Sequence, residues 1–92
     1  MHSPTRTARL DAVLRRLNDE IAARASASST AGFVCECREW ACAEAIELPV
    51  DVYRQVRAEP NRFAVHAGHV AGAPERLVST ASTYAIVERT GS

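Results

Sequence analysis

The sequence predicts an α+β fold, in which an N-terminal amphipathic helix precedes a small antiparallel sheet that carries one further helix. Apolar residues recur at helical spacing near the N-terminus. Short runs rich in aromatic and β-branched residues, typical of strands, follow in the second half of the chain. The expected order is a helix, a hairpin, a second helix and then two or three strands, which is the order of an α+β domain.

Residues 7–25 predict the N-terminal helix. Apolar side chains recur there at offsets of 3, 4, 7 and 11 from the first, as on one face of an amphipathic helix. Such a stripe packs on the core of its own domain or binds a partner helix, including one from a second copy of the chain. We expect part of it to pack on the sheet and part to meet a second chain. The stripe consists of Leu10, Val13, Leu14, Leu17 and Ile21.

The polar segment 26–32 ends this helix and divides the chain. We therefore expect an N-terminal helix and linker at 1–31 and an α+β domain at 32–92. A chain of 92 residues leaves no room for two independent cores, so the two parts should form a single compact unit.

The second part begins with a predicted hairpin. Residues 33–37 predict a short strand that enters a turn, and residues 45–48 predict the returning strand. The second helix is expected at 49–59, because proline suits the first turn of a helix and Asp51 favours its N-terminus. Pro60 should end that helix. Further strands are expected at 62–66, 75–78 and 83–89.

The charge balance restricts the classes of partner. Basic and acidic residues number 11 each, so the chain lacks the positive excess that drives non-specific nucleic-acid binding. Every basic residue is arginine, which together with the abundant alanine is typical of a GC-rich bacterial genome. The sequence contains neither a secretory signal nor an apolar run long enough to span a membrane. We therefore expect a cytoplasmic protein.

All the cysteines lie within eight residues, in the pattern Cys-x-Cys-x4-Cys. Residues i and i+2 of a strand face the same side, so Cys35 and Cys37 can face one ion, and a turn can bring Cys42 to the same point. Zinc prefers thiolate and imidazole ligands, usually four in a tetrahedron. A domain of this size with few large apolar residues would be stabilised by such a metal site. We therefore predict that these thiols bind Zn²⁺.

A histidine is the expected fourth ligand. Strand alternation at 62–66 places Phe63 and Val65 on one face, so His66 would leave the core if those two residues enter it. His69 follows Gly68 in a loop whose backbone can bend to aim a side chain. We favour His69, and His66 remains the alternative.

Other interpretations of the three thiols are weaker. A disulfide with one spare thiol conflicts with the reducing cytoplasm. Three unliganded core cysteines are a further alternative, and an iron–sulfur cluster would lack its fourth cysteine.

The chain also resembles a family of small, largely uncharacterised proteins of high-GC bacteria, over residues 33–90. The resemblance implies a zinc ion bound by cysteines and a histidine, which map onto Cys35, Cys37, Cys42 and His69. The chain departs from the family pattern at Pro49, where threonine is typical, and at Ala67, where proline is frequent. The matching stretches are FVCEC at 33–37, Cys42, VYRQVRAEP at 52–60, RF at 62–63, GH at 68–69 and YAIVER at 84–89.

The sequence contains no Ser/His/Asp pattern and no glycine-rich phosphate loop, so an enzyme is not favoured. Glu36, Glu39 and Glu44 near the thiols are interpreted as solvated carboxylates. We expect a zinc-binding module with a regulatory role that acts by binding a macromolecule. The expected class of partner is a protein. The alternatives are a redox-responsive zinc switch, a small thiol- or zinc-dependent enzyme, or a sequence-specific nucleic-acid module that uses a solvated arginine face. That face comprises Arg54, Arg57 and Arg62.

Overall fold

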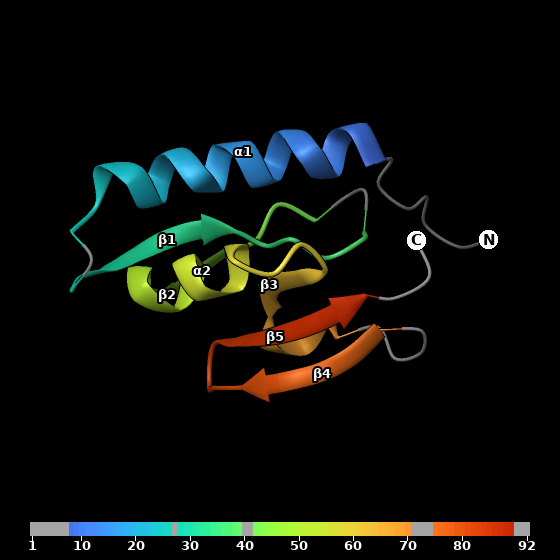
Figure 1. Cartoon of the computed structure of the whole chain (residues 1–92). Coiled ribbons are helices and arrows are strands. Elements are labelled where there is room, and N and C mark those ends of the chain that lie inside the picture. The colour runs from blue at the N-terminus through green and yellow to red at the C-terminus, as the bar shows by residue number, and fades with distance from the viewer. Residues whose placement is uncertain (1–7, 27, 40–41, 71–74, 90–92) are drawn as a thin grey trace.

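The computed structural model describes residues 8–26, 28–39, 42–70 and 75–89. The predicted α+β class is confirmed: two α-helices accompany antiparallel strands within the described residues (Figure 1). Neither helix is long and apolar enough to cross a lipid bilayer. The elements are α1 (Ala8–Arg24), β1 (Thr30–Val34), β2 (Ala45–Pro49), α2 (Val50–Arg57), β3 (Arg62–His66), the 3₁₀ helix η1 (Ala67–His69), β4 (Glu75–Thr80) and β5 (Tyr84–Arg89).

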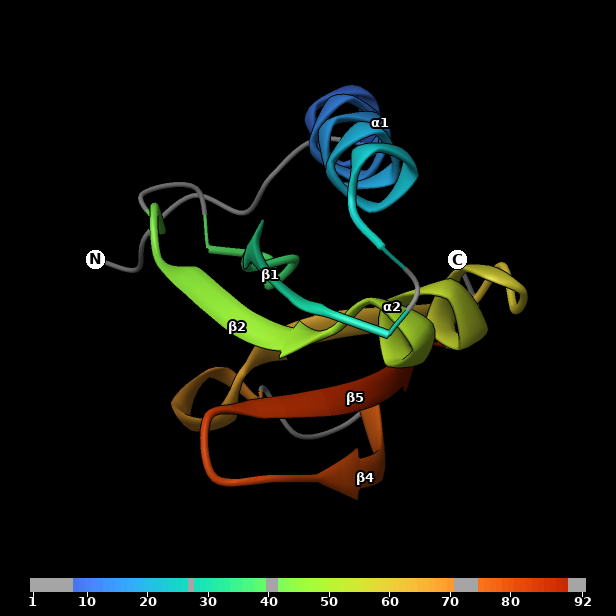
Figure 2. The same ribbon diagram turned by 90° about the vertical axis from the view of Figure 1, so that its left-hand side faces the viewer.

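The strands form two sheets, where the sequence suggested a single small one. β1 and β2 form an antiparallel hairpin, and β5 lies between β3 and β4 in a three-stranded antiparallel sheet. Figure 2 shows α1 above the hairpin and the three-stranded sheet below it. A backbone hydrogen bond of 2.9 Å from Glu36 N–H to Ala64 O joins the chain beyond β1 to β3. The two sheets therefore meet at the cysteine segment.

The core lies between the hairpin, α2 and the three-stranded sheet. Period-two alternation buries Ile46 and Leu48 of β2, while α2 buries one side chain on each turn. The rings of Phe33 and Tyr53 stack with centroids 4.4 Å apart at the centre of this core. Aromatic pairs at this separation stabilise beyond the area they bury, by about 0.5–1.5 kcal/mol.

The face of α1 that packs on the domain is more polar than its apolar stripe suggests. Asn18 and Ala22 are the buried residues within 9–24 of the helix, whereas Val13 and Leu17 are 56% and 44% exposed. The Asn18 side chain pairs with the backbone of Val34 as a neighbouring strand would. Its Nδ2 donates to Val34 O over 2.9 Å, and its Oδ1 accepts from Val34 N–H over 2.8 Å. Buried backbone groups need such partners, so hydrogen bonding sets the rotation of α1.

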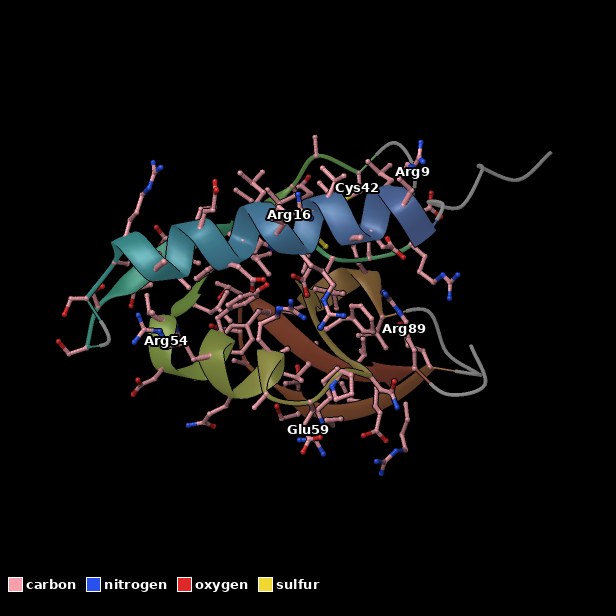
Figure 3. The ribbon with its side chains drawn as sticks, turned by 45° about the horizontal axis from the view of Figure 1, so that its top comes forward. Arg9, Arg16, Cys42, Arg54, Glu59 and Arg89 are labelled. Carbon is pink, nitrogen blue, oxygen red and sulfur yellow. The ribbon has the colours of Figure 1, made fainter. Side chains whose placement is uncertain are left out.

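Arginines of α2 fix the C-terminal half of α1. The Arg57 guanidinium donates to both carboxylate oxygens of Asp19, over 2.7 and 2.9 Å. This contact lowers the pKa of the Asp19 carboxyl. Arg54 projects from α2 towards α1 (Figure 3) and donates to the backbone oxygen of Ala22 over 2.9 Å. Because Asp19 and Arg57 are partly exposed, their pair contributes no more than about 1 kcal/mol.

The interpretation of Arg54, Arg57 and Arg62 as a solvated face is therefore wrong in part. Arg54 and Arg57 bind α1, and Arg62 forms an ion pair of 3.4 Å with Glu88 of β5. Guanidinium groups held by such hydrogen bonds stabilise the fold.

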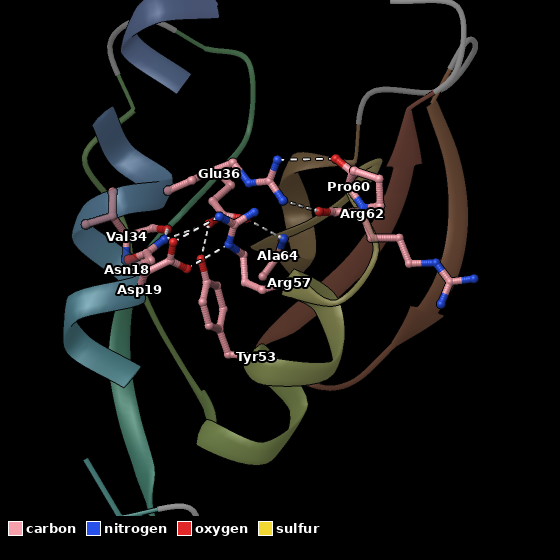
Figure 4. A network of polar contacts seen from close by, with 10 residues as sticks. Asn18, Asp19, Val34, Glu36, Tyr53, Arg57, Pro60, Arg62 and Ala64 are labelled. Carbon is pink, nitrogen blue, oxygen red and sulfur yellow. Dashed lines mark hydrogen bonds and ion pairs between the residues drawn. The ribbon is translucent and has the colours of Figure 1, made fainter. Parts of the chain in front are cut away.

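The interpretation of Glu36 as a solvated carboxylate is wrong, because the residue is only 3% exposed. Its Oε2 accepts hydrogen bonds from Tyr53 OH over 2.8 Å and from Asn18 Nδ2 over 2.9 Å (Figure 4). Its Oε1 accepts from Ala64 N–H over 3.0 Å. Burial and the neighbouring Glu36 carboxylate raise the pKa of Tyr53, so the phenol remains a hydrogen-bond donor.

The backbone of Glu36 is held as firmly as its side chain. Its carbonyl accepts from Arg89 Nη2 over 2.7 Å, and the Nε of this nearly buried arginine pairs with Glu75 Oε2 over 2.6 Å. The guanidinium of Arg89 also lies 4.0 Å from the centroid of Phe63. One residue therefore joins α1, α2 and the three-stranded sheet.

Replacing Glu36 by alanine should destabilise the protein by about 3–5 kcal/mol, because it leaves buried donors without an acceptor. Tyr53→Phe removes one of the hydrogen bonds to a charged acceptor and should cost about 1.5–3 kcal/mol. Urea denaturation curves give both changes in the free energy of unfolding.

Glu44→Ala serves as the matched control, because Glu44 is exposed. That substitution should change stability by no more than about 0.5 kcal/mol. Equal stability of the Glu36 and Glu44 variants would show that the buried network does not hold the fold together.

Candidate metal centre

The three cysteines lie beyond the end of β1, because the strand predicted at 33–37 ends at Val34. Backbone hydrogen bonds still guide the chain. Cys35 N–H donates to Glu44 O over 2.9 Å, and Cys42 N–H donates to Glu39 O over 3.1 Å. These two bonds turn the chain back and return Cys42 to the vicinity of Cys35.

The structure brings together the four residues singled out in the sequence. One ligand atom from each of Cys35, Cys37, Cys42 and His69 lies within 4.8 Å of the other three. The Nδ1 of His69 is 3.5 Å from Cys35 Sγ and 3.6 Å from Cys42 Sγ. Cys35 and Cys37 are buried, whereas Cys42 and His69 are half-buried. The four side chains are close enough to hold one metal ion.

Backbone N–H groups point at two of the sulfur atoms. His66 N–H donates to Cys35 Sγ over 3.1 Å. Burial raises the pKa of both thiols, and backbone hydrogen bonds from Cys37 to Cys35 and from Glu39 to Cys37 oppose part of that rise. Donors of this kind favour the thiolate, which is the form that binds metals.

Burial acts in the opposite direction and dominates. It raises the pKa of Cys35 to about 12 and also raises the pKa of Cys37. A buried thiolate is unfavourable without a nearby cation, since transfer from water costs far more for a charged group than for a neutral one. The two buried sulfurs therefore need a bound cation to become thiolates.

His66 lies beside the four-residue group but outside it. Its Nδ1 accepts a hydrogen bond of 3.1 Å from Gly68 N–H and so caps η1. The alternation expected over residues 62–66 is only partly observed, because β3 buries Ala64 as well as Val65. His69 meets the thiols because η1 turns the chain immediately after β3. The ring of His66 packs on that of His69, with centroids 4.9 Å apart.

The carboxylates near the thiols differ in environment. Glu39 and Glu44 are exposed, as expected for solvated side chains. Glu36 is buried and binds Tyr53 and Asn18. The sequence carried a signal for this burial, because in an extended segment the residue between two cysteines that face one ion faces the opposite side.

Comparisons of the chain with family models, curated proteins and solved structures found no match. The family resemblance over residues 33–90 therefore stays a prediction. Function has to be inferred from the chemistry of the site.

His69→Ala should remove one donor of the four and weaken metal binding by at least about tenfold, whereas His66→Ala should retain most of the affinity. Competition with a chromophoric zinc chelator measures both affinities. An equal loss in the two variants, or a larger loss for His66→Ala, would contradict the assignment of His69 as the fourth ligand.

Proposed function

We propose that the chain is a zinc-binding module that acts by binding another protein in the cytoplasm. The observation that carries the proposal is the convergence of Cys35, Cys37, Cys42 and His69 within 4.8 Å. Three sulfur donors and one imidazole are the soft and borderline ligands that structural zinc sites use.

The distances between the donor atoms support a zinc ion with tetrahedral coordination. With Zn–S bonds of about 2.3 Å and a Zn–N bond of about 2.0 Å, tetrahedral geometry separates sulfur from nitrogen by roughly 3.5 Å. The corresponding distances from His69 Nδ1 to Cys35 Sγ and Cys42 Sγ are 3.5 and 3.6 Å. Carboxylate-preferring ions such as Mg²⁺ and Ca²⁺ do not suit this set of ligands.

A site with four protein ligands is structural more often than catalytic, since catalytic zinc keeps a position for water. The donors come from two parts of the chain, the 35–42 segment and η1, which follow strands of different sheets. Binding one ion would therefore tie the hairpin to the three-stranded sheet. Structural zinc in small domains contributes on the order of 10–16 kcal/mol, which is comparable to the net stability of an ordinary domain.

Protein binding is supported by the surface of α1. Val13 and Leu17 are exposed although the helix is attached by other side chains. The nucleic-acid alternative has less support, because Arg54, Arg57 and Arg62 are engaged within the fold and the net charge is zero. A zinc-dependent enzyme, one form of the enzyme alternative, requires an open coordination position, which four protein ligands would fill.

The purified protein should contain about one zinc ion per chain, and Cys35→Ser or Cys37→Ser should lose both the metal and cooperative unfolding. Elemental analysis after dialysis, combined with thermal melting in the presence and absence of EDTA, measures both properties. Ser79→Ala on the exposed face of β4 is a neutral control. A protein free of metal that melts at the same temperature with and without chelator would rule out a structural zinc ion.

A further inference from the structure

We infer that the exposed side of α1 binds an acidic amphipathic helix of another protein. The inference rests on the proposed function, because it names the class of partner that the module would bind. The surface, called here the α1 outer face, consists of an apolar part, Val13 and Leu17 with the adjoining Leu10 and Leu14, and a charged border, Arg9, Arg16, Glu20 and Arg24.

The apolar part is arranged as a helix-binding surface. Its members are spaced at i, i+3, i+4 and i+7, which is the pattern by which paired helices contact each other. Val13 is 56% exposed and Leu17 is 44% exposed. Leu10 and Leu14 are half-buried beside them. The hydrogen bonds and the ion pair that hold α1 on its own domain are made by other residues of the helix, so Val13 and Leu17 remain exposed.

The charged border is basic, and no described residue outside it neutralises its arginines. Arg9, Arg16 and Arg24 are exposed, and none of their side chains forms a hydrogen bond or ion pair with another described residue. Figure 3 shows Arg9 and Arg16 on α1. Most other described arginines bond to carboxylates or backbone oxygens of the fold. Glu20 is the one acidic residue of this border, so the border has a positive excess.

Charge selects among the possible occupants. A second copy would place one basic border against another in a two-fold pair, which is unfavourable. A phosphate backbone would satisfy the arginines but leave Val13 and Leu17 in contact with water. Anionic lipid would need a wider apolar face with aromatic anchors, and the described helix has no aromatic residue. A helix with leucines along one face and glutamates beside them satisfies both parts of the surface.

The test uses designed peptides of about 18 residues, a length that forms four to five helical turns. One carries leucines at heptad spacing with flanking glutamates, a second carries lysines in place of the glutamates, and a third replaces the leucines by serine. Fluorescence anisotropy with the zinc-loaded protein should show binding of the acidic amphipathic peptide, with an affinity that falls as salt is raised. The lysine and serine peptides should bind at least about tenfold more weakly.

Variants of the protein locate the binding. Val13→Ser combined with Leu17→Ser should lower the affinity for the acidic peptide by at least about tenfold. Arg9→Glu combined with Arg16→Glu should shift preference to the lysine peptide. Leu77→Ser is the matched control, since Leu77 is a similarly exposed apolar residue (49%) on β4. The affinity of the Leu77→Ser variant for the acidic peptide should equal that of the original chain.

Zinc content and the melting temperature are measured for every variant, so that loss of folding is distinguished from loss of binding. If zinc is bound and no peptide binds, the inference is wrong while the zinc proposal stands. Equal binding of the acidic and lysine peptides would also overturn it. So would binding only to anionic phosphatidylserine vesicles, or self-association that Leu17→Ser abolishes.

Discussion

The alternation of three neighbouring side chains organises this structure. Cys35 and Cys37 point to the candidate metal centre, and Glu36 between them points into the core. The carboxylate binds Tyr53 and Asn18, which belong to α2 and α1. The backbone of residues 35–37 is therefore held by contacts on both of its sides. A displacement of the segment would disturb the thiols and the buried carboxylate together.

This coupling explains how a small chain with few large apolar residues stays ordered. The hydrophobic core is centred on the stacked rings of Phe33 and Tyr53. A buried carboxylate is costly unless all of its partners are in place, and here donors from three elements supply them. A metal ion on the opposite side would fix the same backbone. Polar groups thereby fix how α1, α2 and β3 are arranged around the core.

The sequence indicated the four residues that the structure brings together, because three of them lie in one short segment. The Cys-x-Cys spacing and the bend at Gly68 indicated Cys35 and His69 without any knowledge of the fold. The orientation of α1 could not be predicted in the same way. Periodicity detects apolar faces, but Asn18 is buried because it satisfies the backbone of Val34, which lies far away in sequence. Long-range hydrogen bonding leaves no periodic signal in a single sequence.

Zinc K-edge X-ray absorption of the purified protein tests the proposed centre most directly. The expected spectrum corresponds to three sulfur ligands at about 2.3 Å and one nitrogen ligand at about 2.0 Å. His69→Ala should replace the nitrogen contribution with oxygen from solvent, or lose the metal. A spectrum dominated by oxygen ligands, or one with only two sulfur atoms, would contradict a Cys₃His zinc centre formed by Cys35, Cys37, Cys42 and His69.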